Sequence, residues 1–174
     1  MNKTVKTMVY CALFAALTAV CSQFSVPIQP VPINLALFSV YMAGALLGGG
    51  RGAISQIVFL LIGAAGVPVF AGFRGGLQVL AGPTGGYIVG YVAAALITGA
   101  VITRLGAKPF AVALACLMGL IACYALGTAW YCLESSTAPI AALATCVVPF
   151  LPGDAVKILA AALLAPRVKK SIKL

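Results

Sequence analysis

Residues 150–159 read FLPGDAVKIL and hold the only Asp of this 174-residue chain, with a Lys three residues later. Pro152 cannot continue a helix from upstream, so the stretch predicts an interrupted membrane span with a new helix starting near Asp154. A carboxylate near a helix N-terminus is favoured by the helix dipole, and the spacing of Asp154 and Lys157 puts both side chains on one face.

The composition is that of a membrane protein. Hydrophobic residues make up 63% of the chain and charged residues only 7%, which is atypical of a soluble domain of this length. The net charge of +9 does not indicate nucleic-acid binding, because the basic residues are scattered singly between long apolar stretches. The length allows about six spans of roughly 20 residues and no soluble domain, so we expect residues 1–174 to form a single integral membrane domain.

The charge-free intervals locate these spans. Three prolines in SVPIQPVPIN (25–34) divide the first long interval in two, and PFLPGD (149–154) interrupts the last one. We therefore predict an all-α membrane protein with six transmembrane helices, near residues 7–25, 34–48, 51–66, 85–104, 109–133 and 137–168.

The distribution of Lys and Arg predicts the orientation, since cytoplasmic flanks carry the excess of positive charge. With the N-terminus inside, nine of the eleven basic residues are cytoplasmic: Lys3, Lys6, Arg51, Arg104, Lys108, Arg167, Lys169, Lys170 and Lys173. Arg74 and Lys157 fall in the outer half with both acids, Glu134 and Asp154. We expect a multi-pass protein of the bacterial cytoplasmic membrane with both termini in the cytoplasm. A signal peptide over residues 1–21 is the competing interpretation of the N-terminus.

Asp154 is expected to lie deep in the membrane. Thirteen residues of helix between it and Arg167 rise about 20 Å, and the hydrocarbon core is about 30 Å thick. Ionisable groups at such depth usually face a cavity or a partner and mark a functional site. The alternative is a structural ion pair in which Asp154 and Lys157 only neutralise each other.

The segment GVPVFAGFRGGLQVLAGPTGGY (66–87) is rich in Gly, yet too apolar for a solvated loop. We interpret it as a re-entrant segment between the third and fourth helices. Its polar side chains Arg74, Gln78 and Tyr87 are predicted to line the same outward cavity as Asp154 and Lys157. The net charge of that site is +1, which favours an anionic ligand. A flexible hairpin with Arg74 at the lipid headgroups is the alternative.

Side chains for catalysis are scarce. The chain has no His, one Asp and one Glu, its six Cys show no C-x-x-C spacing, and no Walker-type phosphate loop is present. We therefore predict neither an enzyme nor a metal or cofactor site, and energised transport would need a partner that supplies the energy.

Several motifs resemble the BioY family, the biotin-specific substrate-binding (S) components of energy-coupling factor (ECF) transporters. They occur in family order over about residues 5–170: VPIQPVPINLALF (26–38), GVPVFAG (66–72), RGG (74–76), LAGPTGGYIVGY (80–91) and PFLPGDAVK (149–157). The resemblance implies a six-helix protein that captures biotin from outside with high affinity. It also implies two kinds of partner, a transmembrane coupling protein (EcfT type) and two cytoplasmic ATPases (EcfA type).

The resemblance also implies roles for individual residues. Asp154 and Lys157 match the family's polar binding pair, suited to the ureido N–H groups and to an acceptor oxygen. Arg74 is expected to bind the valerate carboxylate; some members carry a basic residue after the GPTGGY tyrosine, where this chain has Ile88. The residues expected to pack around the thiophane ring are Tyr87, Gly82, Ile28 and Ile33.

The first helix carries two overlapping small-xxx-small repeats in CALFAALTAV (11–20), Ala12 with Ala16 and Ala15 with Ala19. Such repeats allow close helix approach, and S components are similar to one another in having an alanine pattern where the coupling protein docks. Internal packing is the alternative. Two other functions stay open at this point: a stand-alone proton-coupled carrier for a small anionic vitamin, and a non-transporting scaffold.

Overall fold

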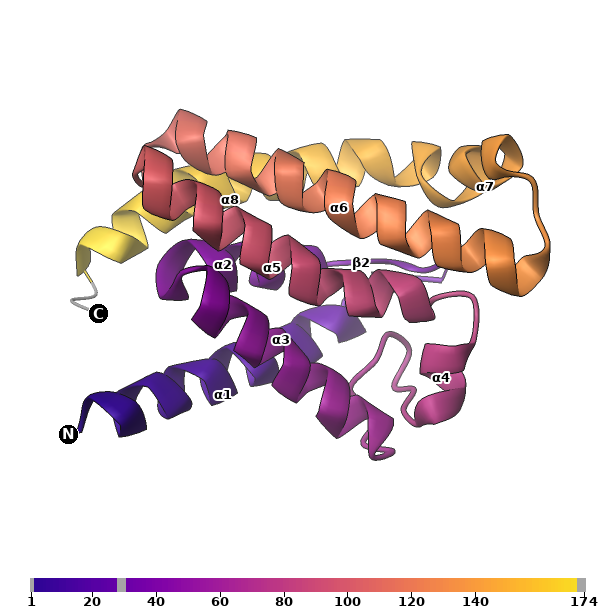
Figure 1. Cartoon of the computed structure of the whole chain (residues 1–174), viewed down its shortest axis with the longest axis horizontal. Helices are drawn as coiled ribbons and strands as arrows, with labels where there is room; N and C mark the ends of the chain where they lie inside the picture. Colours follow the sequence, from indigo (N-terminus) through magenta and orange to yellow (C-terminus); the bar gives the residue numbers. More distant parts are fainter. Residues whose placement is uncertain (1, 28–30, 172–174) are drawn as a thin grey trace.

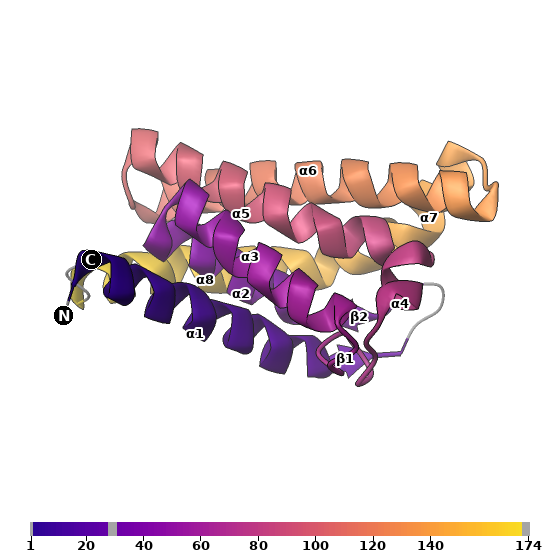
Figure 2. The ribbon, with the colours of Figure 1, turned by 60° about the horizontal axis from the view of Figure 1, so that its bottom comes forward.

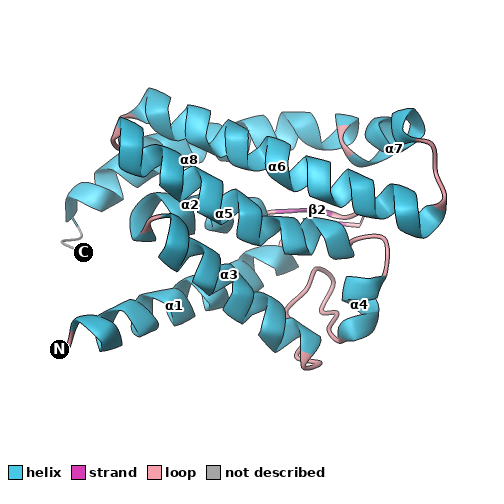
Figure 3. Ribbon diagram, in the orientation of Figure 1, coloured by secondary structure: helices cyan, strands magenta, loops and turns pink. Residues whose placement is uncertain are grey.

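The computed structural model describes residues 2–27 and 31–171 of the chain, most of them in helices (Figures 1 and 3). The elements, in chain order, are α1 (Lys3–Gln23), β1 (Ser25–Val26), β2 (Ile33–Asn34), α2 (Ala36–Leu47), α3 (Gly49–Ala64), α4 (Leu77–Ala81), α5 (Gly85–Leu105), α6 (Pro109–Ser135), α7 (Pro139–Cys146), the 3-10 turn η1 (Val148–Phe150) and α8 (Leu151–Ser171).

Helix α2 is the centre of the fold. Eleven of its twelve residues are buried, and it packs against α1, α3, α5 and α8. A short apolar helix of this kind has no polar face to present, so it is stable only where other helices surround it. Helices α1, α3, α5 and α8 are therefore arranged around α2 (Figure 1).

The long helices α5 and α6 run side by side and make the most extensive helix contact of the molecule. Small residues allow this approach. A side chain added at Gly127 on α6 would collide with the ring of Tyr87 on α5, and one added at Gly90 would meet Cys123. Close backbone approach through small residues is the usual way for membrane helices to pack, and here it places Tyr87 against α6.

The two ends of the bundle differ. The first turn of α1 and the last turn of α8 lie at one end, as do the α2–α3 and α5–α6 turns (Figure 1). The β1–β2 ribbon, the loop before α4, α4 itself and α7 gather at the opposite end (Figure 2). Ser25 pairs with Asn34 and Val26 with Ile33 in this antiparallel ribbon. The irregular backbone is thus concentrated at the end that also holds Asp154.

The predicted all-α class is confirmed. Four helical stretches are long and apolar enough to cross a membrane, and two shorter apolar helices accompany them. The four are Thr4–Gln23, Gly85–Leu105, Pro109–Ser135 and Pro139–Ser171, and the shorter two are Ala36–Leu47 and Gly49–Ala64. The last stretch is divided between α7 and α8 at residues 147–150, which overlaps the predicted interruption at 149–154 only in part, and Asp154 lies in the first turn of α8. The β1–β2 ribbon was not predicted; Ile28 and Lys173 lie outside the described residues.

Candidate functional site

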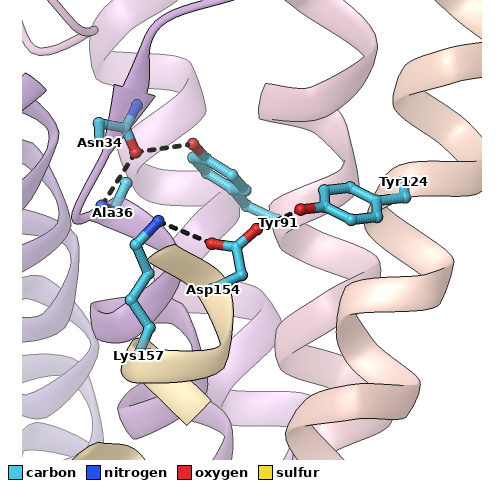
Figure 4. A network of polar contacts seen from close by, with 6 residues as sticks. All are labelled: Asn34, Ala36, Tyr91, Tyr124, Asp154 and Lys157. Atoms are coloured by element: carbon cyan, nitrogen blue, oxygen red, sulfur yellow. Dashed lines mark hydrogen bonds and ion pairs between the residues drawn. The ribbon is translucent and has the colours of Figure 1, made fainter. Parts of the chain in front are cut away.

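Asp154 and Lys157 form an ion pair at the start of α8. The Lys157 ammonium donates to Asp154 Oδ1 at 2.7 Å, and the side chains are 10% and 1% exposed. The hydroxyl of Tyr124 on α6 donates to the other carboxylate oxygen, Oδ2 (Figure 4). Both oxygens of the buried carboxylate therefore have a hydrogen-bond donor, which a buried charge requires.

The local sequence explains why this pair forms. The turn Val148–Phe150 leads directly into α8, where Pro152 stands in the first turn and has no N–H to leave unpaired. The separation of three residues then places Asp154 and Lys157 on one face of the new helix. Packing of α8 against α6 brings Tyr124 to that face.

Asn34 and Tyr91 lie next to the ion pair (Figure 4). The Asn34 side-chain oxygen accepts from the backbone N–H of Ala36 at 3.0 Å, so it closes the turn between β2 and α2. The same oxygen accepts from the Tyr91 hydroxyl at 3.5 Å. These contacts link the loop after α1 to α5 beside the carboxylate.

Two neighbouring cavities meet at these residues. The narrow cavity has a volume of about 30 Å³ and is lined by Asp154, Lys157 and Tyr124, among others. The wide cavity has a volume of about 470 Å³ and is lined by residues of α1, the ribbon, α3, the loop before α4, and α5. Five residues line both: Val31, Pro32, Asn34, Tyr87 and Tyr91. The wide cavity has the size of a small-molecule site, and the narrow one extends it toward the ion pair.

One wall of the wide cavity is a hairpin over residues 67–76 (hereafter the 67–76 hairpin), in which Phe70 and Arg74 exchange backbone hydrogen bonds. The end of α1 holds it. The amide nitrogen of Gln23 donates to the carbonyls of Val69 and Phe70 at 3.0 and 3.2 Å, and its oxygen accepts from the N–H of Phe73 at 2.9 Å.

The hairpin is also fixed by aromatic packing. The buried ring of Phe70 lies edge-on to Phe59 of α3 at a centroid distance of 5.5 Å. It covers Gly63, where an added side chain would collide with the ring. Both rings line the wide cavity and supply apolar surface to it.

The structure brings some of the predicted site residues together and leaves others apart. Asp154, Lys157 and Tyr87 line the narrow cavity, and Arg74 and Tyr87 line the wide one. Neither cavity is lined by Gln78, Gly82 or Ile33. The Gln78 amide nitrogen donates to the carbonyl of Gly75, and the Gly82 carbonyl accepts from the indole N–H of Trp130. Ile28 lies outside the described residues.

The two alanine repeats of α1 face different ways. Ala12 and Ala16 are exposed, whereas Ala15 is buried and Ala19 half-buried. One repeat therefore takes part in internal packing, and the other lies on the outer surface of the bundle.

Sequence reasoning missed Asn34, Tyr91 and Tyr124. Of the three, Tyr124 was the easiest to predict from the sequence. A hydroxyl in the middle of an apolar span needs a hydrogen-bond partner, and Asp154 is the chain's only Asp. Sequence spacing could not predict that Asn34 and Tyr91 are neighbours. Asn34 and Tyr91 are 57 positions apart, and only the packed helices bring them together.

The arrangement suits a ligand with adjacent hydrogen-bond donors and an acceptor. The Asp154 carboxylate accepts, Lys157 donates, and the aromatic and proline side chains around them bind apolar rings. Among residues 2–27 and 31–171, no group of three His, Cys, Asp or Glu side chains is placed to hold a metal ion.

The chain is similar to known proteins over its whole length. A family model described as the BioY family matches residues 1–174. A probable biotin transporter BioY of Pyrococcus horikoshii is 41% identical over 158 residues, covering 91% of this chain and 93% of that protein. The biotin transporter BioY of Thermotoga maritima is 38% identical over 167 residues, covering 95% and 96%.

A solved structure has the same fold. It is the crystal structure of the S-component for biotin from an ECF-type ABC transporter, which superposes with a TM-score of 0.89 at 30% identity. The match covers 98% of this chain and 95% of the solved one.

Proposed function

Because the chain belongs to the BioY family, we propose that it is a high-affinity biotin-binding S component that mediates biotin uptake by an ECF-type importer. It is a multi-pass protein of the cell membrane and a transport protein rather than an enzyme. The observation that carries the proposal is the cluster of the buried Asp154 with the half-buried Lys157 and Tyr124, next to a cavity of about 470 Å³.

The chemistry of biotin matches this cluster. The ureido ring carries two N–H donors and one carbonyl acceptor, so Asp154 would accept from the donors and Lys157 would donate to the carbonyl. The Asp154 side chain is buried and that of Lys157 is only 10% exposed, and hydrogen bonds to charged groups are stronger in such a setting than in water. The thiophane ring would pack against Tyr87 and Tyr91, which line both cavities.

The valerate tail would extend through the wide cavity toward the 67–76 hairpin. Arg74 is the only charged residue that lines this cavity within the described part of the chain. We assign it to the carboxylate of biotin. The other predicted site residues would not contact biotin directly. They would support the loop around α4 (Gln78 and Gly82) and the β1–β2 ribbon (Ile33).

The six-span topology belongs to the same proposal. Helices α2 and α3 have 12 and 16 residues, so each rises about 18–24 Å, short of the roughly 30 Å hydrocarbon core. We propose that both cross the membrane within the bundle, with residues 66–84 re-entering it against α1 and α3. The basic residues favour the cytoplasm for both termini, which would open the wide cavity to the exterior.

Import needs partners, because no phosphate-binding loop is present in the sequence. We propose a coupling protein of the EcfT type and two ATPases of the EcfA type. The exposed Ala12 and Ala16 of α1 would receive the coupling protein, since small exposed residues permit close helix approach.

Isothermal titration of the purified chain with biotin tests the binding function. We expect saturable one-to-one binding; no detectable binding would exclude both transport hypotheses and favour the scaffold. Uptake with and without the ATPase module then separates the importer from a carrier. Accumulation that follows the proton gradient without ATPases would contradict the proposal.

The docking assignment has a separate test. Replacing Ala12 and Ala16 with Trp should abolish co-purification with the coupling protein and leave biotin binding intact. The matched control replaces Ala125 and Ala129, an exposed pair with the same spacing on α6, with Trp. Loss of the complex in both double variants would refute docking at α1.

A further inference from the structure

The hydroxyl of Tyr41, in the middle of α2, is buried without a hydrogen-bond partner. The side chain has no exposed surface. In the described part of the chain, only one other buried side-chain nitrogen or oxygen, the oxygen of Gln56, lacks a partner. Buried polar groups in folded proteins are nearly always paired, because an unpaired one has lost its water and gained nothing in exchange. The Tyr41 hydroxyl therefore calls for a physical explanation.

Tyr41 lies one helical turn beyond the wall of the narrow cavity. Leu37, four residues earlier on the same face of α2, lines that cavity with Asp154 and Tyr124, whereas Tyr41 lines neither cavity. Helix α2 packs against α8, which carries Asp154. Among the ionisable groups whose charge acts on the Tyr41 hydroxyl, Asp154 has the strongest influence. The unpaired hydroxyl is therefore an electrostatic neighbour of the carboxylate in the candidate site.

The Asp154 carboxylate can be stabilised by a further dipole. An ionised carboxylate offers about four acceptor positions, and Lys157 and Tyr124 each occupy one of them. A hydroxyl rotates about its C–O bond, and one without another partner turns its positive end toward a nearby negative charge. Because the side chains of Tyr41 and Asp154 are both buried, water screens this attraction little.

We propose that Tyr41 is a positioning residue for Asp154. Its O–H dipole stabilises the ionised carboxylate from outside the cavity lining, so the acceptor positions on the cavity side stay free for the ureido N–H groups. The consequence for biotin rests on the proposed function, whereas the interaction between Tyr41 and Asp154 belongs to the protein without ligand. The alternative is that the Tyr41 ring only fills the core and its hydroxyl contributes nothing.

Thermal unfolding of the purified chain without biotin tests the interaction. The four proteins compared are the wild type, Tyr41→Phe, Asp154→Asn and the double variant. Tyr41→Phe should lower Tm by about 2–4 °C in the wild type and should not lower it in the Asp154→Asn background, where the charge that the hydroxyl stabilises is absent. A hydroxyl that acts on nothing would behave differently, since its removal would leave Tm unchanged or raise it in both backgrounds.

Titration with biotin tests the consequence for the site. Tyr41→Phe should weaken biotin binding about threefold, because the carboxylate loses one of the groups that stabilise its charge. Tyr10→Phe is the matched control and should bind biotin like the wild type. It removes the hydroxyl of a half-buried tyrosine on α1 that lies outside both linings.

The two measurements fail in different ways. Equal changes in Tm for Tyr41→Phe in the two backgrounds, or the same biotin affinity in Tyr41→Phe as in the wild type, would overturn the proposal. If Asp154→Asn does not fold, the titrations of Tyr41→Phe and Tyr10→Phe decide the question alone. If the wild type binds no biotin but the Tm changes depend on Asp154, the biotin assignment is wrong and the interaction of Tyr41 with Asp154 stands.

Discussion

The narrow and the wide cavity are neighbours, but they are built from different kinds of structure. The charged groups of the narrow cavity and the hydroxyl that binds them, on Asp154, Lys157 and Tyr124, come from long helices, although Asn34 of the ribbon also lines this cavity. The wide cavity has the ribbon and the 67–76 hairpin as walls, and Arg74, the one charged residue among its described lining residues, is exposed.

This difference predicts different roles for the two cavities in ligand binding. A charge pair held on helices and shielded from water can bind a ligand strongly and specifically, because the geometry is set before binding. An exposed charge on a loop is screened by water and salt and contributes much less. Affinity should therefore depend mainly on the narrow cavity, and ligand entry and exit mainly on the wide one.

The largest effect is expected from removing the charge of Asp154. Asp154→Asn removes the carboxylate that accepts from biotin and leaves the half-buried Lys157 without its charged partner, so biotin binding should weaken at least about tenfold in isothermal titration. Glu134→Gln is the matched control, because Glu134 is the chain's other acid and is exposed at the end of α6. Unchanged affinity in Asp154→Asn would defeat the assignment of the ureido site.

A smaller effect is expected at Tyr124. Tyr124→Phe removes the hydroxyl that holds Asp154 Oδ2, so the carboxylate should lose orientation and affinity should fall about fivefold. Tyr131→Phe on the same helix is the control, since Tyr131 is outside both linings. If the two variants bind biotin equally well, Tyr124 has no positioning role.

A weaker effect still is expected in the wide cavity. Arg74→Gln should reduce biotin affinity about threefold, with a loss that shrinks as salt is raised, because the residue is exposed. The neutral amide of biotin, which has no carboxylate, should bind the wild type and the variant equally. A loss of the same size for the amide would show that Arg74 acts on the loop and not on the carboxylate.

The smallest change in affinity is expected at Gln23. Gln23→Ala removes the side-chain hydrogen bonds that tie α1 to the 67–76 hairpin, so the backbone amides of Phe70 and Phe73 should exchange faster with deuterium. Affinity should change about twofold or less, with the effect on the dissociation rate. Unaltered exchange would mean that Phe70 packing alone fixes the hairpin.

Much of the fold was predictable because its cause is local. Charge-free intervals and prolines located the helices to within a few residues; the second was predicted at 34–48 and observed at Ala36–Leu47. An interruption of the last span was predicted at 149–154 from its prolines; the observed break lies a few residues earlier, at 147–150, and Pro152 stands in the first turn of α8. The β1–β2 ribbon was not predictable, since its strands of two residues carry no periodic pattern.

The sequence by itself determined the membrane class and the helix positions, and it singled out Asp154 with Lys157 as a buried pair, since hydropathy and short spacings depend only on neighbouring residues. Tertiary structure alone decided which side chains surround that pair. Tyr124 is 30 positions from Asp154 and Asn34 is 57 from Tyr91, and helix packing alone brings them together. It also decided that Ala12 faces outward and Ala15 inward, because the repeats are the same in sequence and differ only in what packs against them.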